Sequence, residues 1–250
     1  MMLVDDRNRA RIGVLIPYTN TNLEQDMILL RPRGIALHFQ RMGGYDLDEI
    51  PDESQMAGLG ASDRTVPLRL LAGCRPDVVM YGCTSATLTH GSSFDQGLAA
   101  TIRDTMGVPS ITAAGSLVAA MHAMGIRRIG FSSPYVGTIN DRAIAFFADA
   151  GVETVCRADI GRELGNYGQG ELTPDEVYGL ATRADAPDAD AIVLSCTDMR
   201  SVEVVERLEA DLGKPVITSN QAMLYAAMLA IGADPSEVAC GALFRLRAAA

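Results

Sequence analysis

Short apolar runs alternate along the chain with longer segments whose apolar residues recur at helical spacing. Strand-like runs cover residues 11–17, 35–40, 77–81, 108–112, 127–133, 152–157, 190–194 and 213–218. A helix is predicted to begin near residue 23, and others over 65–72, 93–106, 116–124, 140–150, 174–183, 201–212 and 223–231. Unbroken apolar runs are typical of buried strands, and their alternation with helices predicts an α/β fold with parallel sheets and right-handed crossovers.

Two of the strand-like runs end in nearly the same way. The run 77–81 continues into Gly82–Ser85 with Cys83, and the run 190–194 continues into Ser195–Asp198 with Cys196. The carboxyl ends of parallel strands meet at one edge of a sheet, where open α/β sheets bind their ligands. We therefore expect one thiol from each of two units to face a shared cleft.

Further repeats extend this pattern to the whole chain. Residues 127–135 repeat the strand, proline and tyrosine of residues 11–18. The chain is therefore expected to form two pseudo-symmetric α/β halves with the site in the cleft between them. The first half would contain residues 1–113 with the closing segment 221–250, and the second would contain residues 114–220.

The five cysteines do not suggest a disulfide framework or a metal site. Their number is odd, and no CxxC spacing occurs. Cys74, Cys156 and Cys240 are expected to be structural. An inert role for Cys83 and Cys196 is the alternative to catalysis, but their matched settings favour a functional pair.

Composition and charge narrow the possible partners. The formal net charge of −10 and the pI near 4.7 argue against binding to nucleic acid or anionic membranes. No apolar run reaches the roughly 18–20 residues of a membrane span, and residues 1–11 lack the apolar core of a signal peptide. We expect a cytoplasmic protein.

Four strand ends are expected to line the cleft: Tyr18–Asn22, Gly82–Thr87, Ser133–Tyr135 and Ser195–Asp198. They offer thiols, hydroxyls, amides and backbone N–H groups, but no His, Lys or Arg. The three histidines lack metal-ligand spacing, although His90 is near enough to Cys83 to support it, and no phosphate-binding glycine motif follows a strand. Two opposed thiols suit chemistry at the two faces of one carbon, while hydroxyl and N–H donors hold a carboxylate. Residues 42–62 are expected to form a loop, either a flap over the site or a solvated connection.

The strand-end motifs together resemble the aspartate/glutamate racemase superfamily. Its maleate cis–trans isomerase and arylmalonate decarboxylase branch is the most similar, and ectoine-utilisation proteins related to maleate isomerase also look similar. The residues that carry the resemblance are Pro17–Asn20, Gly82–Ser85, Pro134–Tyr135, Ser195–Thr197 and Thr218–Met223. The resemblance covers nearly the whole chain and implies cofactor-independent chemistry on a small carboxylate, without a metal, and a homo-oligomer.

The resemblance also implies roles for individual residues. Cys83 would attack the double bond of maleate, and the covalent adduct would rotate and collapse to fumarate with Cys196 as its acid/base partner. Asn20, Tyr135 and, more loosely, Asn166 match substrate-binding residues of the family. In the decarboxylase branch the residues matching Thr84, Ser85 and Tyr135 would form a dioxyanion hole. Thr197 completes the expected binding residues.

Other functions stay open. The runner-up is a racemase of amino acids or hydantoin-type acids that uses Cys83 and Cys196 as opposed bases. A decarboxylase-like protein or a non-catalytic accessory protein of ectoine breakdown is a further alternative. The decarboxylases carry glycine where this chain has Cys83, which disfavours decarboxylation. Two departures from the isomerases are Tyr18-Thr19, where Ser-Ser is usual, and Asp198, whose role the sequence does not indicate.

Overall fold

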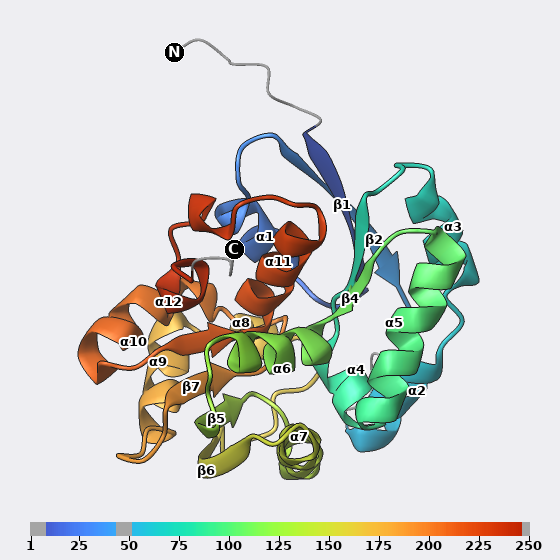
Figure 1. Cartoon of the computed structure of the whole chain (residues 1–250). Helices are drawn as coiled ribbons and strands as arrows, with labels where there is room; N and C mark the ends of the chain where they lie inside the picture. Colours follow the sequence, from blue (N-terminus) through green and yellow to red (C-terminus); the bar gives the residue numbers. More distant parts are fainter. Residues whose placement is uncertain (1–8, 44–51, 247–250) are drawn as a thin grey trace.

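The computed structural model describes residues 9–43 and 52–246, and its strands form two parallel sheets of four strands each (Figure 1). The first sheet has the order β2-β1-β3-β4 and the second the order β6-β5-β7-β8. The strands are β1 (Ala10–Pro17), β2 (Ile35–Met42), β3 (Val78–Tyr81), β4 (Ser110–Thr112), β5 (Arg128–Ser133), β6 (Glu153–Asp159), β7 (Ala191–Leu194) and β8 (Val216–Thr218). All of the paired strands are parallel. The predicted α/β fold with two similar halves is therefore confirmed.

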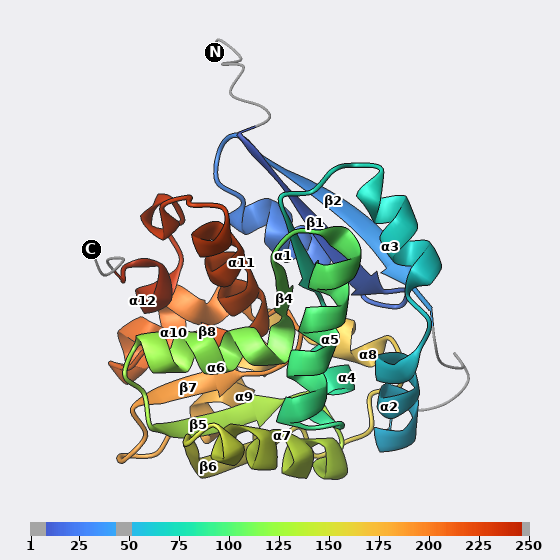
Figure 2. The same ribbon diagram turned by 45° about the vertical axis from the view of Figure 1, so that its right-hand side comes forward.

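Helices connect and cover the strands (Figures 1 and 2). They are α1 (Leu23–Leu30), α2 (Glu53–Ala61), α3 (Thr65–Ala72), α4 (Thr84–Leu88), α5 (Ser92–Met106), α6 (Ala113–Ala123), α7 (Gly137–Asp149), α8 (Gly168–Glu171), α9 (Pro174–Arg183), α10 (Val205–Leu212), α11 (Ser219–Ala230) and α12 (Gly241–Phe244), with short 3-10 turns η1 (Val202–Val204) and η2 (Pro235–Glu237). In the described parts of the chain, no helix is long and apolar enough to cross a membrane.

The two halves use the same device to fix the strand that carries each cysteine. The carboxylate of Asp77, just before β3, accepts the backbone N–H of Arg11 at 2.7 Å. The carboxylate of Asp190, just before β7, accepts the backbone N–H groups of Arg127 and Arg128 at 2.9 and 2.8 Å. Each aspartate thus ties the start of the cysteine-bearing strand to the neighbouring strand, which sets how far the strand end projects.

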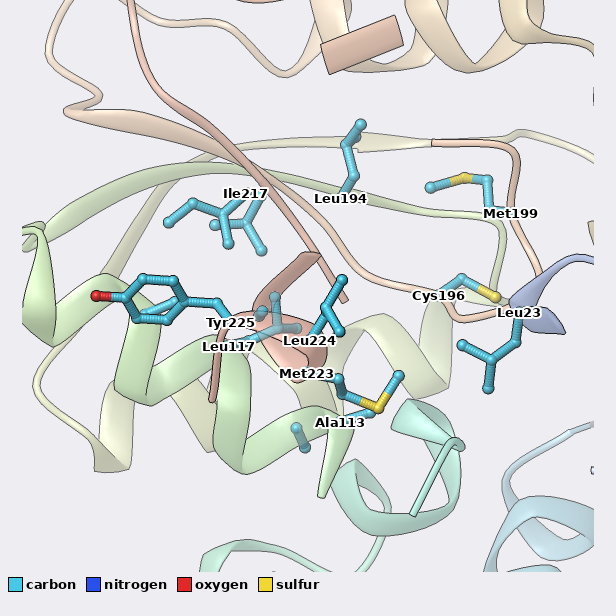
Figure 3. Packing of buried hydrophobic residues seen from close by; sticks show 14 of the residues in the cluster. Leu23, Ala113, Leu117, Leu194, Cys196, Met199, Ile217, Met223, Leu224 and Tyr225 are labelled. Atoms are coloured by element: carbon cyan, nitrogen blue, oxygen red, sulfur yellow. The ribbon is translucent and has the colours of Figure 1, made fainter. Parts of the chain in front are cut away.

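Helices α6 and α11 lie side by side between the two sheets in both views (Figures 1 and 2). Each follows the last strand of its own half, and each contacts both β4 and β8. Figure 3 shows the apolar cluster at this junction, which includes Ala113, Leu117, Leu194, Ile217, Met223 and Leu224. Because all six side chains are fully buried, the halves share one hydrophobic core and the cleft between them has a firm base.

The structure differs from the prediction in two connecting segments. Residues 53–61, expected to be loop, form α2, which the carboxylate of Asp52 caps by accepting the Gln55 N–H at 2.9 Å. Residues 168–171, where no helix was predicted, form α8. Weak periodicity hid both helices: α2 contains two glycines and α8 is a single turn. Residues 44–51 of the predicted flap lie outside the described residues.

The closing segment contacts both halves. Helix α11 begins at Ser219, so the predicted boundary at residue 220 falls inside a helix. It contacts α1, β3 and β4 of the first half, while α12 contacts β8 and α10 of the second. The predicted division of the chain into 1–113 with 221–250 and 114–220 stays a prediction.

Candidate active site

A pocket lies where the carboxyl ends of the two sheets face each other. Its cavity volume is about 30 Å³, which is room for only one or two water molecules, so a larger ligand requires the covering side chains to shift. All eight residues predicted for the site line this pocket. The lining comprises Pro17, Thr19, Asn20, Met56, Leu59, Cys83, Thr84, Ser85, Tyr135, Asn166, Gln169, Cys196, Thr197 and Asp198.

Cys83 lies directly before the first turn of α4. Gly82 allows this position, because a Cβ there would lie 2.4 Å from Cδ2 of Leu23 and 2.8 Å from the Leu15 carbonyl oxygen. Burial raises the pKa of the Cys83 thiol, while the N–H groups of Ala86 and Ser85 and the Ser85 hydroxyl act in the opposite direction by hydrogen bonding to the sulfur. These donors favour the thiolate that a nucleophilic cysteine needs.

Cys196 lies in different surroundings on the opposite half. Its Sγ donates to Oε1 of Gln169 at 3.4 Å and accepts the backbone N–H of Asp198 at 3.3 Å. Burial and then the Asp198 charge raise the pKa of the Cys196 thiol, which hydrogen bonds from Asp198 N–H and Tyr135 lower in part. The two thiols are therefore chemically distinct, and the acceptor and charge beside Cys196 favour its protonated form.

Asn20 and Thr197 connect the halves across the pocket. Nδ2 of Asn20 donates to Oγ1 of Thr197 at 3.0 Å, and that hydroxyl donates to the Gly82 carbonyl at 2.9 Å. Oδ1 of Asn20 accepts the N–H of Leu23 at 2.9 Å, so Asn20 caps α1. Asn22 directly precedes α1, but its side chain makes no capping hydrogen bond, and the backbone N–H groups of Thr21 and Asn22 donate to the Asp198 carboxylate.

Tyr135 and Thr84 lie on facing walls of the pocket. Tyr135 is buried, and its backbone N–H donates to the Ser133 hydroxyl at 3.1 Å, which fixes the residue after β5. Thr84 donates to the hydroxyl of Ser219 at 3.0 Å, another bond that links segments far apart in sequence. Burial, followed by the nearby Cys196 and Cys83, raises the pKa of the Tyr135 hydroxyl well above its usual value. The phenol is a neutral donor at physiological pH.

Six residues that line the pocket were not predicted as site residues. Met56 and Leu59 belong to α2, which the prediction assigned to a loop, and Gln169 belongs to the short helix α8, which was not predicted. Pro17 was noted only as a strand end and as part of a family motif, and Thr19 and Asp198 only as departures from the family. Covering residues come from segments with weak patterns, so their periodicity gave no signal. Tyr18 does not line the pocket, so Thr19 alone places bulk there.

Arg41 supports the Asn20 loop from behind. This residue of β2 donates through Nη1 to the carbonyl oxygens of Pro17, Tyr18 and Asn20 at 3.3, 3.3 and 2.8 Å, and through Nη2 to Glu24 at 2.6 Å. A single guanidinium thus holds the backbone of residues 17–20 in place at the end of β1. This role of Arg41 was not predictable from the sequence, because Arg41 is distant from the loop along the chain.

His90 supports α2 rather than the cysteine. Its Nε2 lies 2.9 Å from the Ala57 carbonyl oxygen, and its ring stacks on Phe94 at a centroid distance of 4.0 Å. In the described part of the chain, no group of three or more His, Cys, Asp or Glu side chains could hold a metal ion. The arrangement favours acid, base or nucleophilic chemistry by thiols on a ligand held by neutral donors.

Behind the site, Asp26 of α1 is a buried carboxylate without a cationic partner in any described hydrogen bond. Its Oδ2 accepts Nδ2 of Asn220 at 2.7 Å, and the same amide donates to the Thr197 carbonyl oxygen at 3.1 Å. Burial raises the pKa of Asp26 to about 7, and the Asn220 hydrogen bond only partly offsets this. The folded protein therefore binds a proton at Asp26 that the unfolded chain releases near pH 4.

Replacing Asp26 by Asn is expected to stabilise the protein increasingly as the pH rises. A raised carboxyl pKa costs stability above the unfolded value of 3.8, and the cost stops growing above the folded value of about 7. The gain in free energy of unfolding for Asp26→Asn should grow by roughly 4 kcal/mol between about pH 4 and about pH 8. Urea unfolding at a series of pH values measures this gap, and a gap that stays constant with pH would contradict the assignment.

Comparison with known proteins adds independent evidence. The family described as arylmalonate decarboxylase matches residues 12–244. A maleate isomerase of Pseudomonas putida is 28% identical over 247 residues, covering 93% of this chain and 96% of that protein. The arylmalonate decarboxylase of Bordetella bronchiseptica is 30% identical over 174 residues, covering 67% and 70%.

Solved structures agree on the fold. A mutant maleate cis–trans isomerase of Nocardia farcinica, bound covalently as a succinylcysteine intermediate, superposes with a TM-score of 0.87 at 22% identity, covering 96% of this chain and 99% of that one. Arylmalonate decarboxylase superposes with a TM-score of 0.73 at 24% identity, covering 94% and 99%. These similarities confirm the resemblance inferred from the strand-end motifs.

Proposed function

Since the chain belongs to the arylmalonate decarboxylase family, we propose that it is a two-cysteine isomerase that converts maleate to fumarate without a cofactor. The observation that carries the proposal is the pair of thiols: Cys83 and Cys196 come from different halves, line one pocket, and have unlike surroundings. The similar maleate isomerases, which match along nearly their whole length, support the substrate.

The proposed reaction begins with the Cys83 thiolate, after its proton has been released to solvent. Its sulfur forms a bond to one alkene carbon of maleate, and the π electrons move to the second alkene carbon. Cys196 donates its thiol proton to that second carbon, which leaves a succinyl group on Cys83 and a thiolate on Cys196. Backbone N–H groups beside Cys83 suit the first step, and the acceptor beside Cys196 orients the second.

In the second half of the reaction, the former double bond is a single bond and the adduct rotates about it. The Cys196 thiolate then removes a proton from the carbon that it had protonated, and the C–H electrons re-form the double bond. The bond between carbon and Cys83 sulfur breaks, and its electrons return to the sulfur. Fumarate leaves with both cysteines in their starting states, so protons and electrons balance over the cycle.

Neutral donors are expected to bind the two carboxylates. Asn20, Thr84, Ser85, Tyr135, Asn166 and Thr197 supply amide and hydroxyl groups around the thiols. Hydrogen bonds to a carboxylate in a buried site are stronger than the same bonds in water. Uncharged donors bind a carboxylate less strongly than charged donors do. The adduct therefore keeps the freedom to rotate about its single bond.

Proton NMR of the protein with maleate in D₂O tests the proposal. The vinyl signal of maleate should be replaced by that of fumarate, and only when Cys83 is present. Unchanged maleate with folded protein would rule the substrate out. Aspartate, glutamate and hydantoins in the same solvent test the racemase alternative, because opposed bases would exchange the α-hydrogen for deuterium. The unlike surroundings of the two thiols favour the isomerase over such a symmetric pair.

The proposal includes a cytoplasmic location and a homo-oligomer. All five cysteines are free, which fits a reducing compartment. Size-exclusion chromatography with light scattering would measure the number of copies that associate.

A further inference from the structure

The carboxylate of Asp198 crosses from one half of the protein to the other. Asp198 follows Cys196 and Thr197 after β7, and its side chain is buried. Its Oδ1 accepts the backbone N–H groups of Thr21 and Asn22 at 2.8 and 3.0 Å and Nδ2 of Asn22 at 3.2 Å. All three donors are amides of the loop that carries Asn20. The negative charge is therefore held in place by neutral groups.

A third segment meets Asp198 and Asn22 at the same point. Nδ2 of Asn22 also donates to the Gly170 carbonyl oxygen at 3.0 Å, next to Gln169. A Cβ at Gly170 would lie 2.8 Å from Nδ2 of Asn22 and 3.1 Å from Oδ1 of Asp198, so only glycine allows this approach. The contact therefore fixes Gln169 with Oε1 on the sulfur of Cys196.

The same carboxylate acts on the Cys196 sulfur. The backbone N–H of Asp198 donates to that sulfur, which keeps the two residues in a tight turn. A negative charge beside a thiol disfavours the thiolate. The charge of Asp198 is the main influence after burial that raises the pKa of Cys196, whereas on Cys83 it ranks behind two hydrogen bonds that lower the pKa. Asp26 is the other titratable group that Asp198 influences.

We infer that Asp198 is a positioning residue that binds the Cys196 loop to the Thr21–Asn22 turn and keeps the proton on the Cys196 sulfur. This inference rests on the proposed function, in which Cys196 donates a proton to the substrate. It explains why an aspartate follows the Cys-Thr pair here. The matching residue in the first half is Ser85, whose hydroxyl lies 3.7 Å from the Cys83 sulfur and carries no charge. Because only the Cys196 side carries a charge, the two thiols differ in how readily they lose a proton.

Alkylation of Cys196 by iodoacetamide, followed by peptide mass spectrometry, tests the inference without any substrate. The parent protein is Cys83→Ser, so that only one thiol of the pocket reacts. Asp198→Asn is then added, which removes the charge but keeps an oxygen acceptor for Thr21. Asn22→Ala is the matched control, because it loses the side-chain bonds while the charge and both backbone N–H donors stay. Asp198→Ser replaces Asp198→Asn if the latter does not fold.

We expect Asp198→Asn to raise the rate of Cys196 alkylation at neutral pH by about tenfold or more, since a nearby like charge suppresses the thiolate at least that strongly. Asn22→Ala should raise this rate by clearly less than Asp198→Asn does, because the charge remains and only the contact that holds Gln169 is lost. An unchanged rate in Asp198→Asn would overturn the inference. An equal increase in Asn22→Ala would also overturn it, since loosening of the loop would then explain the result.

Kinetics with intact Cys83 complete the test. Asp198→Asn should lower kcat for maleate by about 10-fold with little change in KM, because without the Asp198 charge the Cys196 thiolate formed in the first proton transfer is a weaker base for the second. Failure of the wild-type protein to convert maleate would contradict the proposed function. The alkylation rates would still decide the role of Asp198, so the two failures are distinguishable.

Discussion

Replacing Cys83 by Ser is expected to reduce maleate turnover by at least about 10³-fold while the protein stays folded. The hydroxyl of serine holds its proton far more tightly than a thiol, and the described residues that line the pocket include no histidine or lysine that could act as its base. The N–H groups of Ser85 and Ala86 support a thiolate but do not make an alkoxide accessible near neutral pH. Steady-state rates and circular dichroism of the variant measure the two parts of this expectation.

Cys74→Ser is the matched control for this change. Cys74 is a free, partly exposed thiol after α3 that does not line the pocket. Its loss should leave the rate within about twofold of the wild-type rate, as for most surface substitutions. Retention of activity in Cys83→Ser would remove the covalent mechanism altogether.

Replacing Cys196 by Ser is expected to slow turnover by about 10²–10⁴-fold, the usual contribution of a positioned acid or base. The substrate adduct should also accumulate on Cys83. Water can supply a proton slowly to the second carbon, but the variant has no thiolate to remove it again. Mass spectrometry of the variant with maleate should find one bound maleic acid on the peptide that contains Cys83.

A different turnover rate or a different mass-spectrometry result would change the proposed mechanism. An adduct on another cysteine would exchange the roles of the two thiols, and no adduct with normal turnover would make Cys196 dispensable. Cys156→Ser serves as the control, because Cys156 belongs to β6 and does not line the pocket. The paired results from Cys83 and Cys196 separate attack from proton transfer.

The paired strand ends could be predicted because they depend on local rules. A buried run followed by a small residue and a cysteine places the thiol at the edge of a parallel sheet, and both Cys83 and Cys196 lie there. The helix over 174–183 was predicted to the residue, since Thr173 and Glu176 form a capping box with Pro174 at the first turn. Strong caps and unbroken apolar runs predict local structure well, because tertiary contacts do not override them.

Long-range contacts around the site were not predictable from the sequence. The donors that hold Asp198 come from Thr21 and Asn22, far away along the chain, and the guanidinium of Arg41 reaches the Asn20 loop from another strand. Helix α2 lacks a clear apolar stripe, so its contribution of Met56 and Leu59 depends on tertiary packing. A pattern in one segment does not show which other segment will supply its partner.

The two aspartates at the starts of β3 and β7 have a consequence for how this kind of protein can diversify. Each anchors its own reactive loop to its own sheet, through bonds that do not involve the other half. The loop ends, in contrast, are joined across the pocket through Asn20, Thr197 and Asp198. In a duplicated fold of this kind, new chemistry therefore requires the two loop ends to change together, while the anchored strands below them can stay as they are.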